Sequence, residues 1–190
     1  MKIKLIVLLL LLSSQLIYSQ GFKGGLIGGL VVSQVDGDAY AGYHKIGIQG
    51  GIYSRYIFNK SWSLYNELKF IQKGSNQTNK DDPYSDFKIK LNYIGLPFIL
   101  NYQYNDKFIF GAGLSYGILM SAEVQDGAGI VDQEHLSYHN YDANLIIQIK
   151  YTLNEHLWID VKGSYSIIYI TDEAPRQFNN LISFSLGYEF

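Results

Sequence analysis

The fold is decided by residues 144–167, which read NLIIQIKYTLNEHLWIDVKGSYSI. On either side of the polar triplet 154–156, apolar side chains occupy almost every second position. These positions are Leu145, Ile147, Ile149, Tyr151 and Leu153 before the triplet, and Leu157, Ile159, Val161, Tyr165 and Ile167 after it. Because successive side chains of a β-strand point to opposite faces, the pattern predicts a tight hairpin with one apolar and one polar face.

The same alternation recurs in six other stretches of the chain. They are residues 22–32, 45–58, 62–70, 94–102, 108–117 and 182–190, and in the first of them glycine and apolar residues occupy both faces. From the second stretch onward, no apolar face carries a charge. The strand charges share the opposite faces, at Lys45, Arg55, Glu67, Lys69, Lys107, Lys150, Asp160, Lys162 and Glu189. This segregation predicts eight amphipathic strands.

The connections between these strands fall into two classes. Three are short, at 59–61, 104–106 and 154–156, and four are long and polar, at 33–44, 74–86, 121–138 and 171–179. The short turns keep the apolar faces in phase, so Ile52 is expected beside Leu68, and Ile149 beside Val161. Short turns at one end and long loops at the other are typical of a transmembrane barrel, with its turns in the periplasm and its loops outside.

Alternation alone does not say which face points outward, and a soluble secreted ligand-binding barrel shows the same period. Three features favour the membrane. Strands of about ten residues or more suit a tilted span, glycines cluster on the charged face, where a narrow interior is crowded, and aromatic residues gather at the ends of the apolar faces. We therefore predict an all-β, eight-stranded antiparallel up-and-down transmembrane β-barrel in the cell outer membrane, with the soluble barrel as the alternative.

The first residues of the chain predict export. Lys2 and Lys4 precede an unbroken apolar run at 5–12, which ends in small and polar residues, as in a secretory signal peptide. We place a cleaved signal peptide at 1–19 and the barrel domain at 20–190. Without the two lysines the formal charge falls from −2 to −4, so the chain offers no basic face for nucleic acid. The chain has no cysteine, which excludes a disulfide scaffold and a thiolate metal site.

Four short motifs give the chain a resemblance to a known family. They are FKGGL at 22–26, ELKF at 67–70 followed by Lys73 and Gly74, LNYIGLPF at 91–98, and LGYEF at 186–190. Together they span the mature chain, and it resembles the PorT-like outer-membrane β-barrel family common in Bacteroidetes-type bacteria. The resemblance implies outer-membrane placement without implying a specific activity. Gly95 departs from the acidic residue that such proteins tend to carry before the Leu-Pro step.

The charged faces predict a polar plug inside the barrel. Asp160 is expected opposite Lys150, and Tyr53 opposite Glu67, because buried charges and hydroxyls need partners. The predicted interior plug comprises Arg55, Glu67, Lys69, Lys150, Asp160, Lys162 and Glu189. Since eight strands leave an interior that side chains largely fill, a wide pore is not expected.

The sequence carries weak signals for catalysis or metal binding. The serines at 164, 166, 183 and 185 lack a neighbouring histidine on their strands. His135 and His139 are four residues apart near Asp132 and Glu134, but residues with this spacing share a face only on a helix, and the segment is predicted to be a loop. We therefore predict no catalytic residue, no cofactor and no metal site.

The predicted last strand carries an insertion signal. Phe184, Leu186, Tyr188 and Phe190 alternate up to the final residue, resembling the signal by which outer-membrane barrels are recognised for insertion. The expected partners are outer-membrane lipid, the barrel-assembly machinery through this strand, and an envelope or surface partner at the outer loops. The predicted function is a structural or interaction scaffold, and the alternative is a barrel enzyme acting on envelope lipids or peptides.

Overall fold

The computed structural model describes residues 21–38, 42–77, 87–126, 129–130, 138–172 and 174–190. The predicted signal peptide, at 1–19, lies outside these residues. The strands are β1 (Phe22–Asp36), β2 (Lys45–Ile57), β3 (Trp62–Gln77), β4 (Phe87–Gln103), β5 (Phe108–Asp126), β6 (Gly129–Ile130), β7 (Tyr141–Thr152), β8 (Leu157–Ser166) and β9 (Phe178–Glu189). In the described residues, no helix is long and apolar enough to cross a membrane.

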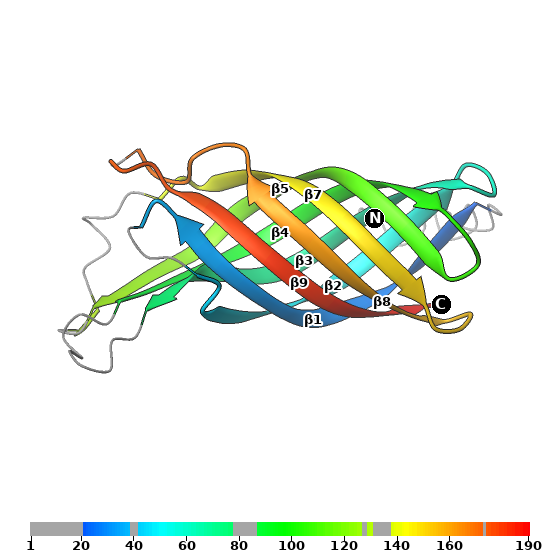
Figure 1. Ribbon diagram of the computed structural model, residues 1–190, viewed down its shortest axis with the longest axis horizontal. Coiled ribbons are helices and arrows are strands. Elements are labelled where there is room, and N and C mark those ends of the chain that lie inside the picture. Colours follow the sequence, from blue (N-terminus) through cyan, green and yellow to red (C-terminus); the bar gives the residue numbers. More distant parts are fainter. Residues whose placement is uncertain (1–20, 39–41, 78–86, 127–128, 131–137, 173) are drawn as a thin grey trace, which may run out of the picture.

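Eight of these strands close into an antiparallel barrel, as predicted. Neighbouring strands follow the order β4-β3-β2-β1-β9-β8-β7-β5, with β5 also paired to β4 across a short turn, and pairing of β1 with β9 closes the ring. The two-residue strand β6 adds only to the far end of β5. Figure 1 shows the barrel from the side, with its strands tilted relative to the long axis. The short turns, the start of β1 and the end of β9 lie at one end, and the strand ends that are joined by the long connections lie at the other. We call these the turn end and the loop end.

The predicted register is confirmed at both tested hairpins. Ile52 pairs with Leu68 and Ile149 with Val161. Each short turn contains an asparagine whose side-chain oxygen accepts backbone hydrogen bonds from residues two and three positions ahead. In the first turn, Asn59 Oδ1 accepts from the nitrogens of Ser61 and Trp62, at 2.9 and 3.0 Å. Asn105 and Asn154 repeat this arrangement, which holds the turns tight without glycine.

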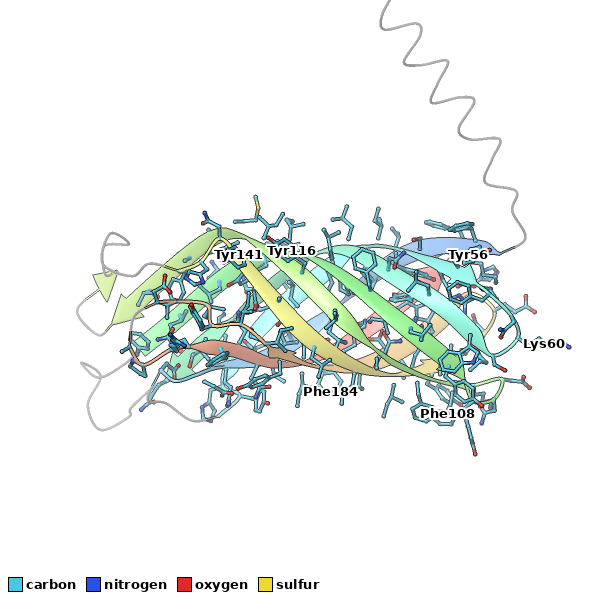
Figure 2. The ribbon with its side chains drawn as sticks, turned by 90° about the horizontal axis from the view of Figure 1, so that it is seen from above. Tyr56, Lys60, Phe108, Tyr116, Tyr141 and Phe184 are labelled. Atoms are coloured by element: carbon cyan, nitrogen blue, oxygen red, sulfur yellow. The ribbon has the colours of Figure 1, made fainter. Side chains whose placement is uncertain are left out.

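The outer surface is apolar between two rings of aromatic side chains. Exposed apolar residues on every long strand include Leu26, Ile48, Leu68, Phe98, Leu114, Ile147, Val161 and Phe184. The turn-end ring includes the pairs Phe22–Tyr56, Trp62–Tyr102 and Phe108–Tyr151, and the loop-end ring includes Tyr116–Tyr141 and Tyr165–Phe178. Figure 2 shows Tyr56 and Phe108 near the turn end, Tyr116 and Tyr141 nearer the loop end.

This apolar surface has the height of a bilayer core. On β5 its outward stripe runs from Phe108 to Met120, which corresponds to about 30 Å at a rise of about 3.3 Å per residue and a tilt near 40°. The interior faces of the same strands are crowded, as the glycines predicted. A Cβ at Gly113 would collide with the Phe98 backbone, and one at Gly187 with the Trp158 ring.

The strands are longer than predicted at the loop end. β1 extends to Asp36, β3 to Gln77 and β5 to Asp126, while β4 begins at Phe87 and β9 at Phe178. Each predicted long loop is therefore partly strand. The sequence prediction was wrong here because it followed the outward apolar stripe, which stops before the backbone pairing does. We call the strand segments 72–77, 87–92 and 121–126 the loop-end extension.

Candidate functional site

Six of the seven predicted plug residues are buried inside the barrel, and the seventh, Arg55, is partly buried. The centre of the plug is Glu67 on β3, whose side chain is fully buried. Its oxygens lie 2.8 Å from Lys69 Nζ and 2.7 Å from Lys162 Nζ, and Lys162 also pairs with Asp160 at 2.7 Å. Charges in such a dry interior are stable only when paired, so this cluster fixes β3 relative to β8 across the barrel.

Lys150 has a different partner from the predicted one. It does lie opposite Asp160 in the β7–β8 register, but Asp160 pairs with Lys162 instead. Lys150 Nζ lies 3.7 Å from the ring centroids of both Tyr65 and Trp158. The electron-rich faces of aromatic rings attract a desolvated cation, so these rings take the place of the expected carboxylate.

Tyr53 was also predicted to interact with its cross-strand neighbour Glu67. The register is as expected, but the Tyr53 hydroxyl points toward the turn end of the barrel and not toward Glu67. It lies 3.4 Å from Glu189 and accepts a hydrogen bond from Trp158. Glu189 pairs with Arg55 at 2.8 Å and with Lys23 at 2.7 Å. Long side chains inside a narrow barrel reach past the adjacent residue, so register alone does not identify their partners.

A second buried cluster, nearer the loop end, was missed from sequence. Lys73 Nζ lies 2.8 Å from Asp142 Oδ2 and donates to Asn144. Ser166 and Asn179 also donate to Asp142, at 2.7 and 2.8 Å. Lys73 lies beyond the predicted end of its strand and Asp142 before the predicted start of its own. The sequence did contain a signal for this cluster, because Lys73 lies at an even spacing from Glu67 and Lys69 and therefore on the same inward face of the strand.

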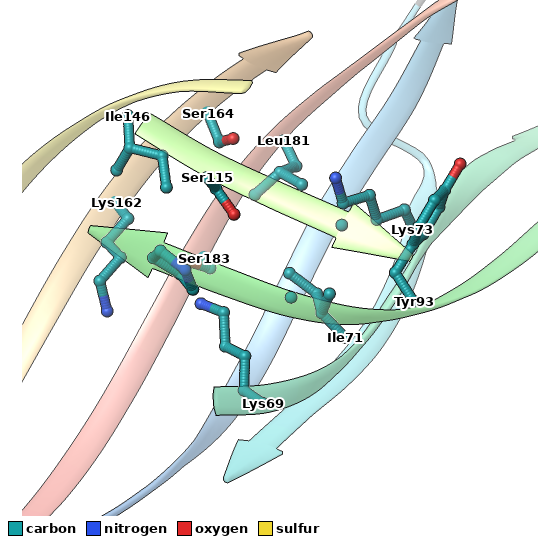
Figure 3. A pocket seen from close by; sticks show the side chains of 13 residues that line it. Lys69, Ile71, Lys73, Tyr93, Ser115, Ile146, Lys162, Ser164, Leu181 and Ser183 are labelled. Carbon is teal, nitrogen blue, oxygen red and sulfur yellow. The ribbon is translucent and has the colours of Figure 1, made fainter. Parts of the chain in front are cut away.

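Between the two clusters lies a small cavity, seen in Figure 3 with Lys69, Lys73, Lys162 and Tyr93 around it. Its volume is about 20 Å³, which is room for about one or two water molecules. Three serines, Ser115, Ser164 and Ser183, also line it. A space of this size can hold water between the charged clusters, but it cannot admit a substrate.

His139 forms hydrogen bonds that join the segment before β7 to the connection between β8 and β9. His139 Nε2 lies 3.0 Å from Asp172 Oδ2, and Nδ1 lies 3.1 Å from the Tyr169 carbonyl oxygen. His135, Asp132 and Glu134 lie outside the described residues. Within the described ranges, no three His, Cys, Asp or Glu side chains are grouped to hold a metal ion.

On β4 and β5, the inward side chains of the loop-end extension are apolar, whereas its β3 segment has the buried polar residues Lys73 and Ser75. The apolar side chains pack with residues from β1, β9 and the β8–β9 connection. This cluster comprises Val31, Val35, Ile71, Ile89, Leu91, Tyr93, Val124, Ile170 and Leu181. The outward side chains at the same level are polar, including Lys88, Lys90 and Asn92. The extension is therefore a packed platform beyond the apolar band.

Comparison with known proteins decides the family. The family model of the outer membrane protein beta-barrel domain matches residues 14–172. The chain belongs to this family. Its location is the outer membrane, so the soluble alternative is wrong, and the apolar outer surface faces lipid.

Solved barrels share this fold at low sequence identity. Ail, the attachment invasion locus protein of Yersinia pestis, matches with a TM-score of 0.55 and 15% identity over 90% of this chain and 99% of Ail. Neisserial surface protein A matches with a TM-score of 0.60 and 14% identity over 90% of this chain and 100% of that protein. No curated protein matches the sequence.

Proposed function

We propose that this outer-membrane barrel is a rigid, non-catalytic scaffold whose loop end contacts an envelope or surface partner. The observation that carries the proposal is the loop-end extension, with its own apolar core and an outward polar surface. The platform is a frame for the connections at this end, and binding residues usually concentrate in loops on rigid frames.

The plug supports the same function. Ion pairs of 2.7–2.8 Å link β3, β7 and β8 at two levels, and the cavity between them has room for little more than water. An interior of this kind stiffens the frame, and the cavity between the two clusters has no space for a substrate. Ail, a barrel of the same fold, has been crystallised with the heparin analogue sucrose octasulfate. That complex is a precedent for ligand binding by a small barrel.

A single introduced cysteine tests the proposal, because the chain has none of its own. Cysteines at Asn76 or Gln125 would carry a cross-linker at the loop end, and one at the exposed Glu155 would carry it at the turn end. In intact cells we expect partner adducts from the first two variants, and their loss when residues 127–137 are replaced by a short turn. Adducts that survive this replacement, or that form equally from the cysteine at position 155, would contradict the proposal.

We also propose that the last strand delivers the chain to the barrel-assembly machinery, after export through the signal peptide at 1–19. Phe184, Leu186, Tyr188 and Phe190 all point outward from β9, and Phe190 is 74% exposed at the turn end. This leaves the aromatic stripe accessible to a receptor until the barrel closes.

Within the family, we propose a place among the PorT-like members. The support is the set of motifs at 22–26, 67–74, 91–98 and 186–190, of which LNYIGLPF occupies β4 where the inward side chains are Tyr93, Gly95 and Pro97. A phylogeny of the family tests this, and grouping of the chain outside the PorT-like branch would overturn it.

A further inference from the structure

The outer face of the loop-end extension is built from registered rows across β3, β4 and β5 that consist of polar side chains and one glycine, Gly74. The rows are Gln72–Asn92–Ser121, Gly74–Lys90–Glu123 and Asn76–Lys88–Gln125. The row directly below them is Phe70–Ile94–Ile118, which is entirely apolar. The change from apolar to polar therefore occurs within one row on all three strands.

The lowest polar row marks the upper limit of the hydrocarbon layer. Gln72 donates to Asn92 at 3.0 Å, and Asn92 donates to Ser121 at 2.8 Å, so the amides satisfy one another across the strands. Lys90 is two residues above Asn92 and Lys88 is four above it. At about 3.3 Å per residue and a tilt near 40°, these lysines stand about 5 and 10 Å above the hydrocarbon. The headgroup layer is about 5–8 Å thick on each side of the bilayer.

The lysines are available for an external anion. Lys88 is exposed. Lys90 pairs with Glu123 at 3.3 Å, with the two side chains 33% and 41% exposed. An exposed pair of this length is weak, and the ammonium keeps donors for a second acceptor. A long lysine side chain can also bend up or down, which places its ammonium group at the depth where it is best solvated.

The opposite side of the barrel differs at this height. There Tyr43 donates to Asn180 at 2.7 Å, and Asn180 donates to Asp36 at 3.4 Å. That side offers a carboxylate and amides, and Arg176 in the β8–β9 connection lies over the Tyr169 ring. On the described strands, Lys45 at this end is buried, so Lys88 and Lys90 are the lysines that reach the outer surface here. A one-sided positive patch at headgroup depth is complementary to a lipid phosphate.

We propose that Lys88 and Lys90 form a binding site for the phosphate groups of outer-leaflet glycolipid. The occupant is a membrane lipid held beside the barrel, with its acyl chains along the apolar stripe below Phe70 and Ile94 and its phosphate over β4. The site is separate from the loop partner, because it lies on the lipid-facing side of the extension.

Native mass spectrometry of the purified full barrel in detergent tests the site, with lipid A bisphosphate as the probe. We expect the double variant Lys88→Gln/Lys90→Gln to bind lipid A about thirtyfold more weakly, since each of the two basic groups near a lipid surface contributes about 1 kcal/mol. Glu123→Gln should bind about threefold more tightly, because it removes a repulsive charge and releases Lys90. Lys60→Gln, an exposed lysine at the turn end, is the matched control and should bind as the unaltered protein does.

Two further probes separate the sources of the phosphate. The unaltered barrel and the double variant should bind dephosphorylated lipid A equally well. Inorganic phosphate at matched concentration should not displace lipid A from the unaltered barrel. Equal binding of lipid A by the unaltered barrel and the double variant would overturn the site, whereas displacement by free phosphate would overturn the lipid as its occupant. Circular dichroism of each variant confirms that the barrel is folded.

Discussion

Strand β4 crosses two environments without changing phase. In its first part Ile89 and Leu91 point inward while Lys88, Lys90 and Asn92 point outward. In its second part the outward side chains are Ile94, Leu96, Phe98, Leu100 and Tyr102, and the inward positions are Tyr93, Gly95, Pro97, Ile99 and Asn101. The outward side chains of this strand thus change from polar in the loop-end extension to apolar in the membrane band.

This difference shows that the surroundings, and not the strand period, set which face is apolar. Lipid headgroups and water surround the extension, so apolar burial inside it is favourable. Lipid surrounds the band, where outward apolar groups are already solvated and inward polar groups must pair with one another. The extension is therefore held by its apolar core, and the band by closed backbone pairing and the plug.

The largest expected difference between the two regions concerns ion pairs. Glu67→Gln removes the buried partner of Lys69 and Lys162, and we expect a loss of about 3–5 kcal/mol in unfolding free energy. Glu123→Gln removes the exposed partner of Lys90 and should cost less than about 1 kcal/mol. Urea unfolding in lipid vesicles measures both. Adding Lys69→Gln to Glu67→Gln should restore part of the loss, and similar losses from the two single variants would contradict the comparison.

Core packing provides the next test, on β4 itself. Leu91 is fully buried in the extension, and Leu100 is 46% exposed on the lipid-facing side. Leu91→Ala should cost about 3–4 kcal/mol, because a cavity adds to the lost transfer energy. Leu100→Ala should cost about 2 kcal/mol, since lipid fills the space and only the transfer energy is lost. Limited proteolysis should find new cleavage at the loop end for Leu91→Ala alone, and faster cleavage of both variants would argue against a separate core.

An arginine on the outer face should lower the unfolding free energy by about 2–4 kcal/mol in the membrane band, and by much less in the loop-end extension. Ile147 is 64% exposed in the middle of the β7 stripe, where an arginine near the bilayer midplane carries that cost. Asn92→Arg, at the polar row of β4, should cost about 0–1 kcal/mol. Unfolding from vesicles and the yield in the outer membrane report the difference. Equal tolerance of the two arginines would show that the band does not face lipid.

The smallest effect on stability is expected at the turn-end border of the band. Phe190→Asp and Phe58→Asp each place a charge beside exposed aromatic residues, and each should cost less than about 1 kcal/mol. If β9 carries the insertion signal, Phe190→Asp alone should lower the outer-membrane yield and leave protein in the periplasm. An unchanged yield for Phe190→Asp, or the same loss for Phe58→Asp, would count against a specific C-terminal signal.

Most of the barrel could be predicted, but only part of its interior. The pairings of Ile52 with Leu68 and Ile149 with Val161 followed from alternation and turn length. Lys150 and Tyr53 were predicted to contact their cross-strand neighbours, yet both reach other groups. A long side chain inside a narrow barrel can contact residues on any of the surrounding strands. The register between neighbouring strands therefore does not identify its partner.

The sequence by itself determined the strands, their phase and the direction of the hairpins, because these depend on local alternation and on turn residues such as Asn59, Asn105 and Asn154. Only the tertiary structure decided that Lys150 rests against Tyr65 and Trp158, that Lys73 joins Asp142, and that Ile89 and Leu91 enclose a second core beyond the membrane. The physical reason is closure. Residues far apart in the chain meet only when β1 pairs with β9, and the environment at each height then selects which contacts are stable.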